Sequence, residues 1–244
     1  MIKKTFFGEG NSKQLAALMA IQEFDRYIRT FNNVQFVEAY NISGDAYRYI
    51  YKIDGCENLH YCIENSTSAS NANISMTLRK TDQLYTSSYL RSLGSGGETE
   101  SFIEFDAYII AYNGRLKGIW TTRVGSFYPY PCYFIEKNGE RYCYTTTNSP
   151  SNPQQVYRDS DTAELYLDRN YWKYSINEKA LFRKAIIAVG YSGSNVIYIE
   201  QADDMWIIEN ENFANMANML IDIDGVRYRQ WGTNYVFVLD GDVE

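Results

Sequence analysis

The sequence predicts a mainly β protein: an antiparallel, hairpin-built sandwich or barrel-like domain with one N-terminal α-helix packed on it. Three observations predict this class: two-residue turn signals, period-two alternation of apolar and polar residues, and one helical pattern near the start. Asp and Asn tolerate the left-handed conformation that a type I′ turn needs, and Gly adopts it without steric cost. Such pairs separate aromatic-rich alternating segments at Asp54-Gly55, Asn113-Gly114, Asn138-Gly139 and Asp224-Gly225.

The turns also predict which residues face each other across the hairpins. Counting outward from them places opposite charges directly across three hairpins: Lys52 and Glu57, Glu136 and Arg141, Asp222 and Arg227. Each such pair stabilises a hairpin by about 0.2–1 kcal/mol, so the three matches support these registers. At the remaining turn, Tyr112 and Arg115 flank the Asn-Gly pair.

The helix is expected over about residues 12–31, where Ser12 can cap the first turn. Its apolar stripe, expected to pack on a sheet, follows a helical spacing through Leu15, Leu18, Met19, Gln22, Tyr27 and Phe31. From residue 34 onward the spacing changes to period two, which is typical of strands. Later strands are expected at 163–167, 195–200, 205–208 and 235–239; a short helix fits 212–219, and 177–189 fits a helix running into a buried strand.

Two polar segments are expected to be loops. One covers residues 92–101 and is rich in glycine; the other covers 147–155 and contains two prolines, which block strand pairing. The second loop is a possible sub-boundary. We nevertheless expect a single β-rich domain over residues 1–244, because the composition on both sides of this loop is the same.

Composition and charge exclude several classes of protein. A chain of 244 residues that is 45% hydrophobic can fill a sizeable core. The net charge of −7 argues against a nucleic-acid partner, whose phosphates need clustered Lys and Arg. The basic pairs Lys3-Lys4 and Arg79-Lys80 are therefore interpreted as solvated surface.

No targeting or membrane segment is expected. The start, MIKKTFFGEG, lacks the apolar stretch of about 7–15 residues of a signal peptide. The longest apolar run, residues 185–189, is far shorter than the roughly 20 residues that cross a bilayer. The chain is therefore expected to be made and kept in the cytosol, or to be assembled there into something larger.

The cysteines suggest two sites, and neither is assigned. Cys56, His60 and Cys62 form the densest cluster of potential zinc ligands, but their spacing lacks the usual pairs, so buried thiols and a hydrogen-bonded imidazole are favoured. Cys132 and Cys143 flank one hairpin, where the register places Cys143 opposite Phe134 and Cys132 on the diagonal. We therefore expect no metal and four free thiols.

Three short motifs resemble functional sites but lack the flanking residues or the structure that those sites need. Gly190–Ser194 comes one residue short of a nucleophile elbow and precedes a strand-like segment instead of a helix. Gly94–Gly97 lacks the Lys-Ser/Thr ending of a phosphate-binding loop and is expected to be a flexible loop. Asp222 would start a calcium loop whose twelfth residue is Thr233 instead of Glu. The two-residue turn at Asp224-Gly225 therefore explains this segment better. No catalytic and no cofactor-binding residue is assigned.

Paired carboxylates leave one enzymatic alternative open. A glycoside hydrolase needs only two acids, and a Tyr- and Trp-rich β scaffold resembles a sugar-binding cleft. The candidate acids are Asp106, Glu136, Asp203, Asp204 and Glu209. Because 30 acidic residues guarantee several plausible pairs, a hydrolase is the less favoured alternative.

Two binding functions are left: a subunit of a larger assembly, and a discrete module that binds a glycan or a peptide. With 23 Tyr and hairpin-rich β segments, the chain resembles structural proteins of phage particles, specifically tail, neck or baseplate components. It differs from the best-known tail-tube pattern in its N-terminal helix. The resemblance implies a non-enzymatic subunit of the virion that assembles in the host cytoplasm and contacts other subunits and copies of itself. Residues 1–10 and 94–101 are the candidate contact arms, with an ordinary frayed terminus and an ordinary loop as the alternative.

Overall fold

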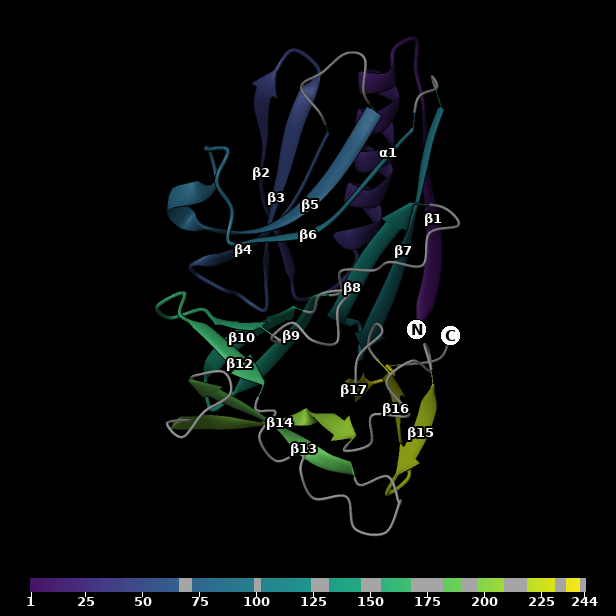
Figure 1. Ribbon diagram of the computed structural model, residues 1–244. Coiled ribbons are helices and arrows are strands. Elements are labelled where there is room, and N and C mark those ends of the chain that lie inside the picture. Colours follow the sequence, from purple (N-terminus) through teal and green to yellow (C-terminus); the bar gives the residue numbers. More distant parts are fainter. Residues whose placement is uncertain are drawn as a thin grey trace. The chain divides into compact units, whose positions relative to one another are not determined.

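The computed structural model describes residues 1–65, 72–98, 102–123, 132–145, 155–167, 182–189, 197–208, 219–230 and 236–241. Every strand pair in these ranges is antiparallel, and α1 (Lys13–Ile28) precedes all strands but the first (Figure 1). The predicted class, mainly β with an N-terminal helix, is confirmed. The described strands form open sheets instead of a closed barrel.

The chain divides into two compact units, Met1–Tyr130 with Asp242–Glu244, and Pro131–Gly241. The single domain expected over residues 1–244 stays a prediction. Most of the proposed sub-boundary, residues 147–154, lies outside the described ranges.

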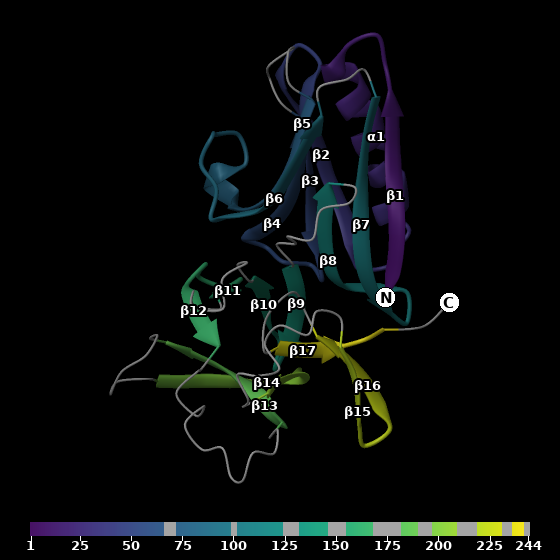
Figure 2. The same ribbon diagram turned by 45° about the vertical axis from the view of Figure 1, so that its right-hand side comes forward.

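The first unit contains α1 and the strands β1 to β8 (Figure 2). One sheet has the order β2-β3-β4-β5-β6, and β7 pairs with both β1 and β8. A short 3-10 helix, η1 (Thr81–Gln83), follows β5. The strand bounds are β1 (Ile2–Glu9), β2 (Val34–Ser43), β3 (Ala46–Ile53), β4 (Leu59–Asn65), β5 (Ala72–Lys80), β6 (Arg91–Glu98), β7 (Phe102–Tyr112) and β8 (Arg115–Arg123).

The helix begins as predicted, because Ser12 caps it by accepting a hydrogen bond from the Leu15 amide at 3.1 Å. It packs on β1 and β7 and also on β3, β4 and β5. Leu18 and Phe31 of the predicted stripe are buried, but Met19 is 41% exposed. The buried face also includes Ala17, Ile21, Phe24 and Ile28, which the predicted stripe left out. Phe24 lies at the centre of the core, with its ring 5.2 Å from Phe6, 5.8 Å from Phe105 and 6.5 Å from Tyr61.

All four Asx-Gly pairs adopt the predicted left-handed turn. The φ of the Asp or Asn lies between 51° and 55°, and that of the Gly between 71° and 79°. Three of the four predicted registers are confirmed: Glu136 faces Arg141, Asp222 faces Arg227, and Tyr112 faces Arg115.

The turn at Asp54-Gly55 is the exception. It closes as a two-residue turn, because the Cys56 amide donates to the Ile53 carbonyl at 3.0 Å. The predicted charge pair also forms, with Lys52 Nζ 3.1 Å from Glu57 Oε2. Beyond this pair the register changes: β4 begins only at Leu59, and Tyr51 faces Tyr61, where continuation of the turn register would give Asn58. The chain therefore leaves the hairpin register between Glu57 and Leu59.

The glycine-rich segment is a strand, which corrects the prediction of a flexible loop and contact arm for its described part. β6 pairs along β5, with Gly94 facing Met76 and Gly96 facing Ile74. It also packs against β8 and β7. Glycine has low strand propensity, but it allows another backbone to approach closely, and pairing with β5 outweighs the propensity.

The first ten residues are not a free arm either. β1 pairs with β7 over its whole length, from Ile2 facing Ile109 to Glu9 facing Phe102. Its inward positions include the buried Phe6 and Gly8. The sequence of this strand already alternates with period two, but the lysines at positions 3 and 4 make the pattern less evident.

The second unit contains nine described strands in the order β9-β10-β11-β12-β13-β14-β17-β16-β15. Segment 182–189 forms a strand, and the two strands predicted within 195–208 are one continuous strand, β14. The predictions at 177–181, 190–194 and 212–218 lie outside the described residues. The bounds are β9 (Cys132–Lys137), β10 (Glu140–Thr145), β11 (Gln155–Arg158), β12 (Glu164–Leu167), β13 (Phe182–Val189), β14 (Ile197–Ile208), β15 (Leu220–Ile223), β16 (Val226–Gln230) and β17 (Val236–Leu239).

Candidate functional site

A row of polar side chains crosses one face of the β2–β6 sheet. Tyr40 on β2 faces Arg48 on β3, Arg48 faces Glu64 on β4, and Glu64 faces Ser75 on β5. Residues directly opposite each other share a face of an antiparallel sheet, so these four side chains lie on one side. The helix covers the other side, where the Tyr51 hydroxyl donates to Asp25 of α1 at 2.8 Å.

Two buried guanidinium groups share one carboxylate on this face. Arg48 Nε donates to Glu64 Oε2, and Arg79 Nη2 lies 3.3 Å from Glu64 Oε1. Burial lowers the pKa of Arg79, and the Glu64 charge opposes that shift. The two arginine cations and the single Glu64 anion leave one excess positive charge within this cluster.

The same arginines hold the segment 81–90, which projects from the sheet with η1 (Figures 1 and 2). Arg48 Nη1 donates to the Leu84 carbonyl, and the Leu84 side chain packs on Ile50 and Cys62. Arg79 Nη1 donates to three further backbone oxygens of the segment, those of Gln83, Thr86 and Ser88. The segment is therefore fixed to the sheet by charge-assisted hydrogen bonds, which are stronger than neutral ones.

A cavity of about 480 Å³ lies over the polar row. Its lining comes from β2 to β5 and from residues 85–87, and it includes Arg48, Glu64 and Ser75. Tyr40 and Tyr85 also line it, with ring centroids 5.1 Å apart in an edge-to-face arrangement. The Tyr85 hydroxyl donates to the Glu38 carboxylate, which raises the pKa of Tyr85. We call this space the Arg48 cavity.

A second cavity, of about 400 Å³, lies beside the turns Asp54-Gly55 and Asn113-Gly114. Asn33 joins these turns: its Nδ2 donates to Asp54 Oδ1 at 2.8 Å and to the Leu116 carbonyl at 2.9 Å, and its Oδ1 accepts from the Leu116 amide at 2.7 Å. Arg115 adds an ion pair to Asp54 at 2.5 Å. These polar atoms already bind one another, which indicates a structural role.

The cluster Cys56, His60 and Cys62 is buried. Within the described ranges, no group of three or more His, Cys, Asp or Glu residues could hold a metal ion. Burial raises the pKa of the Cys62 thiol to about 12, so it stays protonated near neutral pH. A metal needs the thiolate, which makes Cys62 a poor ligand.

Cys132 and Cys143 are closer than the register suggested. Cys143 faces Phe134 as predicted, yet the two sulfur atoms lie 2.8 Å apart across the diagonal. Both side chains are on the same face of the β9–β10 hairpin and lean toward each other. All four cysteines are free thiols, as predicted, and burial raises the pKa of Cys143.

These thiols are expected to be unreactive in the folded protein. Alkylation at neutral pH should be slow for all four, because they are buried and only the thiolate reacts. Denaturation without a reductant should release four titratable thiols. A count below four, or fast labelling of the native protein, would contradict this expectation; mass spectrometry of the alkylated protein measures both.

Of the candidate acids of a glycoside hydrolase, Asp106 and Asp203 form ion pairs with lysines. Asp106 is buried, accepts from Thr5 Oγ1 at 2.6 Å and lies 2.8 Å from Lys3 Nζ. Lys137 binds Asp203 and lowers its pKa, which is opposite to the shift that a general acid needs. Glu136 faces Arg141, Asp204 is on β14, and Glu209 is outside the described residues.

Sequence patterns alone misplaced Arg79, one residue of the basic pair at the end of β5. Arg79 was expected on the solvated surface but is only 1% exposed. The available signal was the alternation of Ser75, Thr77 and Arg79 with the apolar residues 74, 76 and 78. That pattern shows a strand with one polar face, but only the order of the strands shows that Arg48 and Glu64 meet Arg79 there.

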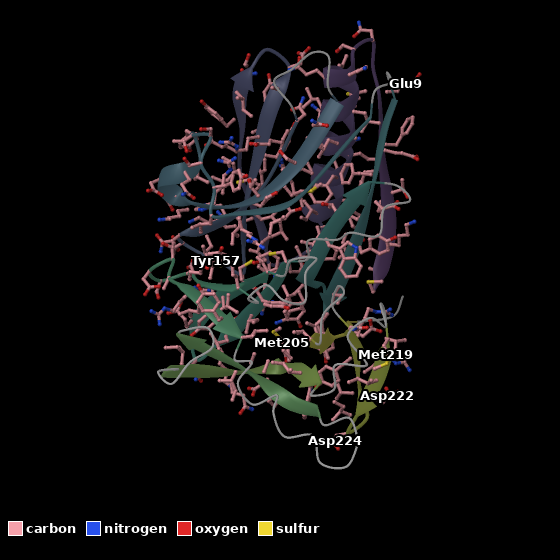
Figure 3. All side chains as sticks on the ribbon, viewed as in Figure 1. Glu9, Tyr157, Met205, Met219, Asp222 and Asp224 are labelled. Atoms are coloured by element: carbon pink, nitrogen blue, oxygen red, sulfur yellow. The ribbon has the colours of Figure 1, made fainter. Side chains whose placement is uncertain are left out.

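The β15–β16 hairpin carries an incompletely covered apolar face in the second unit. Ile221, Ile223, Val226 and Tyr228 share this face, and Trp206, Met219 and Leu239 pack against Tyr228. Val226 is 40% exposed, and Leu220 on the opposite face is 45% exposed. Figure 3 shows Met219, Asp222 and Asp224 along the β15 strand and its turn. β15 ends the described strand order, so one of its edges has no partner strand there.

No helix in the described part of the chain is long and apolar enough to cross a membrane. The chain matches no protein-family model, no curated protein and no solved structure.

Proposed function

We propose that the chain is a non-enzymatic structural subunit of a larger protein assembly. The assembly is a phage particle, in which the chain serves as a tail, neck or baseplate component in the virion after assembly in the host cytoplasm. It acts through contacts with other subunits and with copies of itself.

The observation that carries this proposal is the β15–β16 hairpin. Its outer edge offers backbone donors and acceptors to another strand, and its apolar face holds the exposed Val226 beside Tyr228. Exposed edges with apolar side chains are liabilities in a monomer and contact surfaces in an assembly. A strand from a neighbouring subunit could pair with the backbone of this edge, and the rest of that subunit could cover the apolar face.

The edge of the five-stranded sheet is less suited to this role. β2 ends the order of that sheet, but its pairing with β3 shifts register between Phe36 and Glu38 and again between Asn41 and Ser43. Bulges of this kind protect an edge from pairing with another strand. The β15–β16 hairpin therefore carries the proposal alone.

The class of assembly rests on the composition. The 23 Tyr and the hairpin architecture resemble phage structural proteins, and tyrosine is enriched at protein interfaces because it joins an apolar ring to a hydroxyl.

Charge on the hairpin should block assembly. We expect the native protein to form defined oligomers and the double variant L220K/V226K to be monomeric, because both positions are exposed and lysine opposes edge pairing. Met19→Lys, at a similarly exposed position on α1, is the matched control and should assemble like the native protein. Mass photometry measures the three distributions. Equal oligomerisation of native and double variant would refute a role of the hairpin.

The Arg48 cavity favours a second function, a ligand-binding β module, because it combines an aromatic wall with a buried cation.

A further inference from the structure

We propose that the Arg48 cavity binds a sugar that carries a carboxylate, such as a uronic or sialic acid unit of a glycan. This site is independent of the assembly proposed above, since every residue that forms it belongs to the first unit and the hairpin belongs to the second.

Arg48 supplies the group that recognises the anion. Its side chain is 5% exposed, and its Nε and Nη1 already donate to Glu64 and to the Leu84 carbonyl. Within the described residues, Nη2 makes no hydrogen bond, while Arg48 lines the cavity. A guanidinium N–H that has no partner in the described protein is available to a ligand, and a carboxylate oxygen is the acceptor that suits it best.

The charge of the site selects a monoanion. Arg48 and Arg79 together exceed Glu64 by one positive charge, and Glu64 is already bound by both arginines. A ligand carboxylate would neutralise this excess. A phosphate dianion would leave a net negative charge beside Glu64. The Glu38 carboxylate, which accepts from Tyr85, repels any anion at this site, and it repels a dianion more strongly than a monoanion.

The rest of the lining suits a sugar ring. Tyr40 and Tyr85 present aromatic surface, against which the C–H face of a sugar packs. Asn73, Ser75 and Ser87 line the same space, and their side chains make no hydrogen bond within the described part of the chain. Neutral donors and acceptors of this kind match hydroxyl groups. The volume of about 480 Å³ is in the range of small-ligand sites.

Binding of simple sugars tests the site directly. We expect isothermal titration calorimetry to detect glucuronic acid or N-acetylneuraminic acid, with glucose and galactose at least about tenfold weaker, the loss for one charge-assisted hydrogen bond. Inorganic phosphate and N-acetylglutamate are run in parallel as other anions. Tighter binding of N-acetylglutamate would assign the cavity to an acidic peptide, and tighter binding of phosphate would assign it to a phosphate ligand; either result overturns the proposal.

Two variants at accessible lining positions keep the test independent of folding. Asn73→Ala and Tyr85→Ala should each weaken binding of the acidic sugar several-fold, because both side chains are exposed and line the cavity. Tyr112→Ala, an exposed tyrosine of the same unit outside the cavity, should bind like the native protein. Unchanged binding by both lining variants, or no binding of any acidic sugar by the native protein, would overturn the proposal.

Discussion

Replacing Gly8 by alanine is expected to lower the free energy of unfolding of the first unit by about 3 kcal/mol, the upper range for overpacking a core. A Cβ at this position would lie 2.0 Å from the Ala16 carbonyl oxygen and 2.5 Å from the Ala20 amide nitrogen. Both are backbone atoms of α1, so neither can rotate away and the helix itself must shift from β1. Urea unfolding followed by circular dichroism measures the change.

Gly44→Ala is the matched control within the same unit. Gly44 has a φ of 55° and no atom within 4 Å of an added Cβ, so alanine there meets conformational strain without a clash. This strain costs about 1 kcal/mol. If Gly8→Ala is no more destabilising than Gly44→Ala, the helix does not pack on β1 as closely as described.

Glu64→Gln is expected to destabilise the first unit by about 3–5 kcal/mol, because removing one partner of a buried ion pair leaves its other charges uncompensated. Here two guanidinium groups, those of Arg48 and Arg79, lose their shared carboxylate. The segment 81–90 should loosen as well, since both arginines hold its carbonyl oxygens. Chemical unfolding gives the free energy, and limited proteolysis reports on the segment.

Glu57→Gln provides the comparison on an exposed pair. The Glu57 side chain is 76% exposed and pairs with Lys52, so its loss should cost less than about 1 kcal/mol. Similar effects of the two substitutions would mean that the Glu64 cluster is solvated and does not organise the sheet face.

Local signals predicted the turns well. A type I′ turn depends on the two residues within it, so the four Asx-Gly pairs and the Ser12 cap were visible in the sequence. The register that continues from a turn is less local. At Asp54-Gly55 the bonds from Asn33 and Arg115 hold the turn, and β4 takes a different register beyond it.

Pairing between distant segments could not be predicted from local patterns. β1 joins β7 across about a hundred residues, and β6 pairs with β5 despite its glycines. Both segments have compositions typical of loops or arms. Their partners, not their own propensities, make them strands.

The candidate site was missed for the same reason. Arg48, Glu64 and Arg79 come from three strands, and each alone fits an ordinary exposed charge. Their burial follows from the segment 81–90, which covers this face of the sheet and brings Leu84 onto Cys62. Only the assembled sheet brings the two cations onto one carboxylate.

The most direct test of the proposed function is negative-stain electron microscopy of the purified native chain beside L220K/V226K. We expect rings, tubes or other defined oligomers from the native protein and isolated single particles from the variant, because the variant places charge on the free edge and apolar face of the β15–β16 hairpin. A native protein that remains a single particle at every concentration would contradict the assembly function and favour a ligand-binding module.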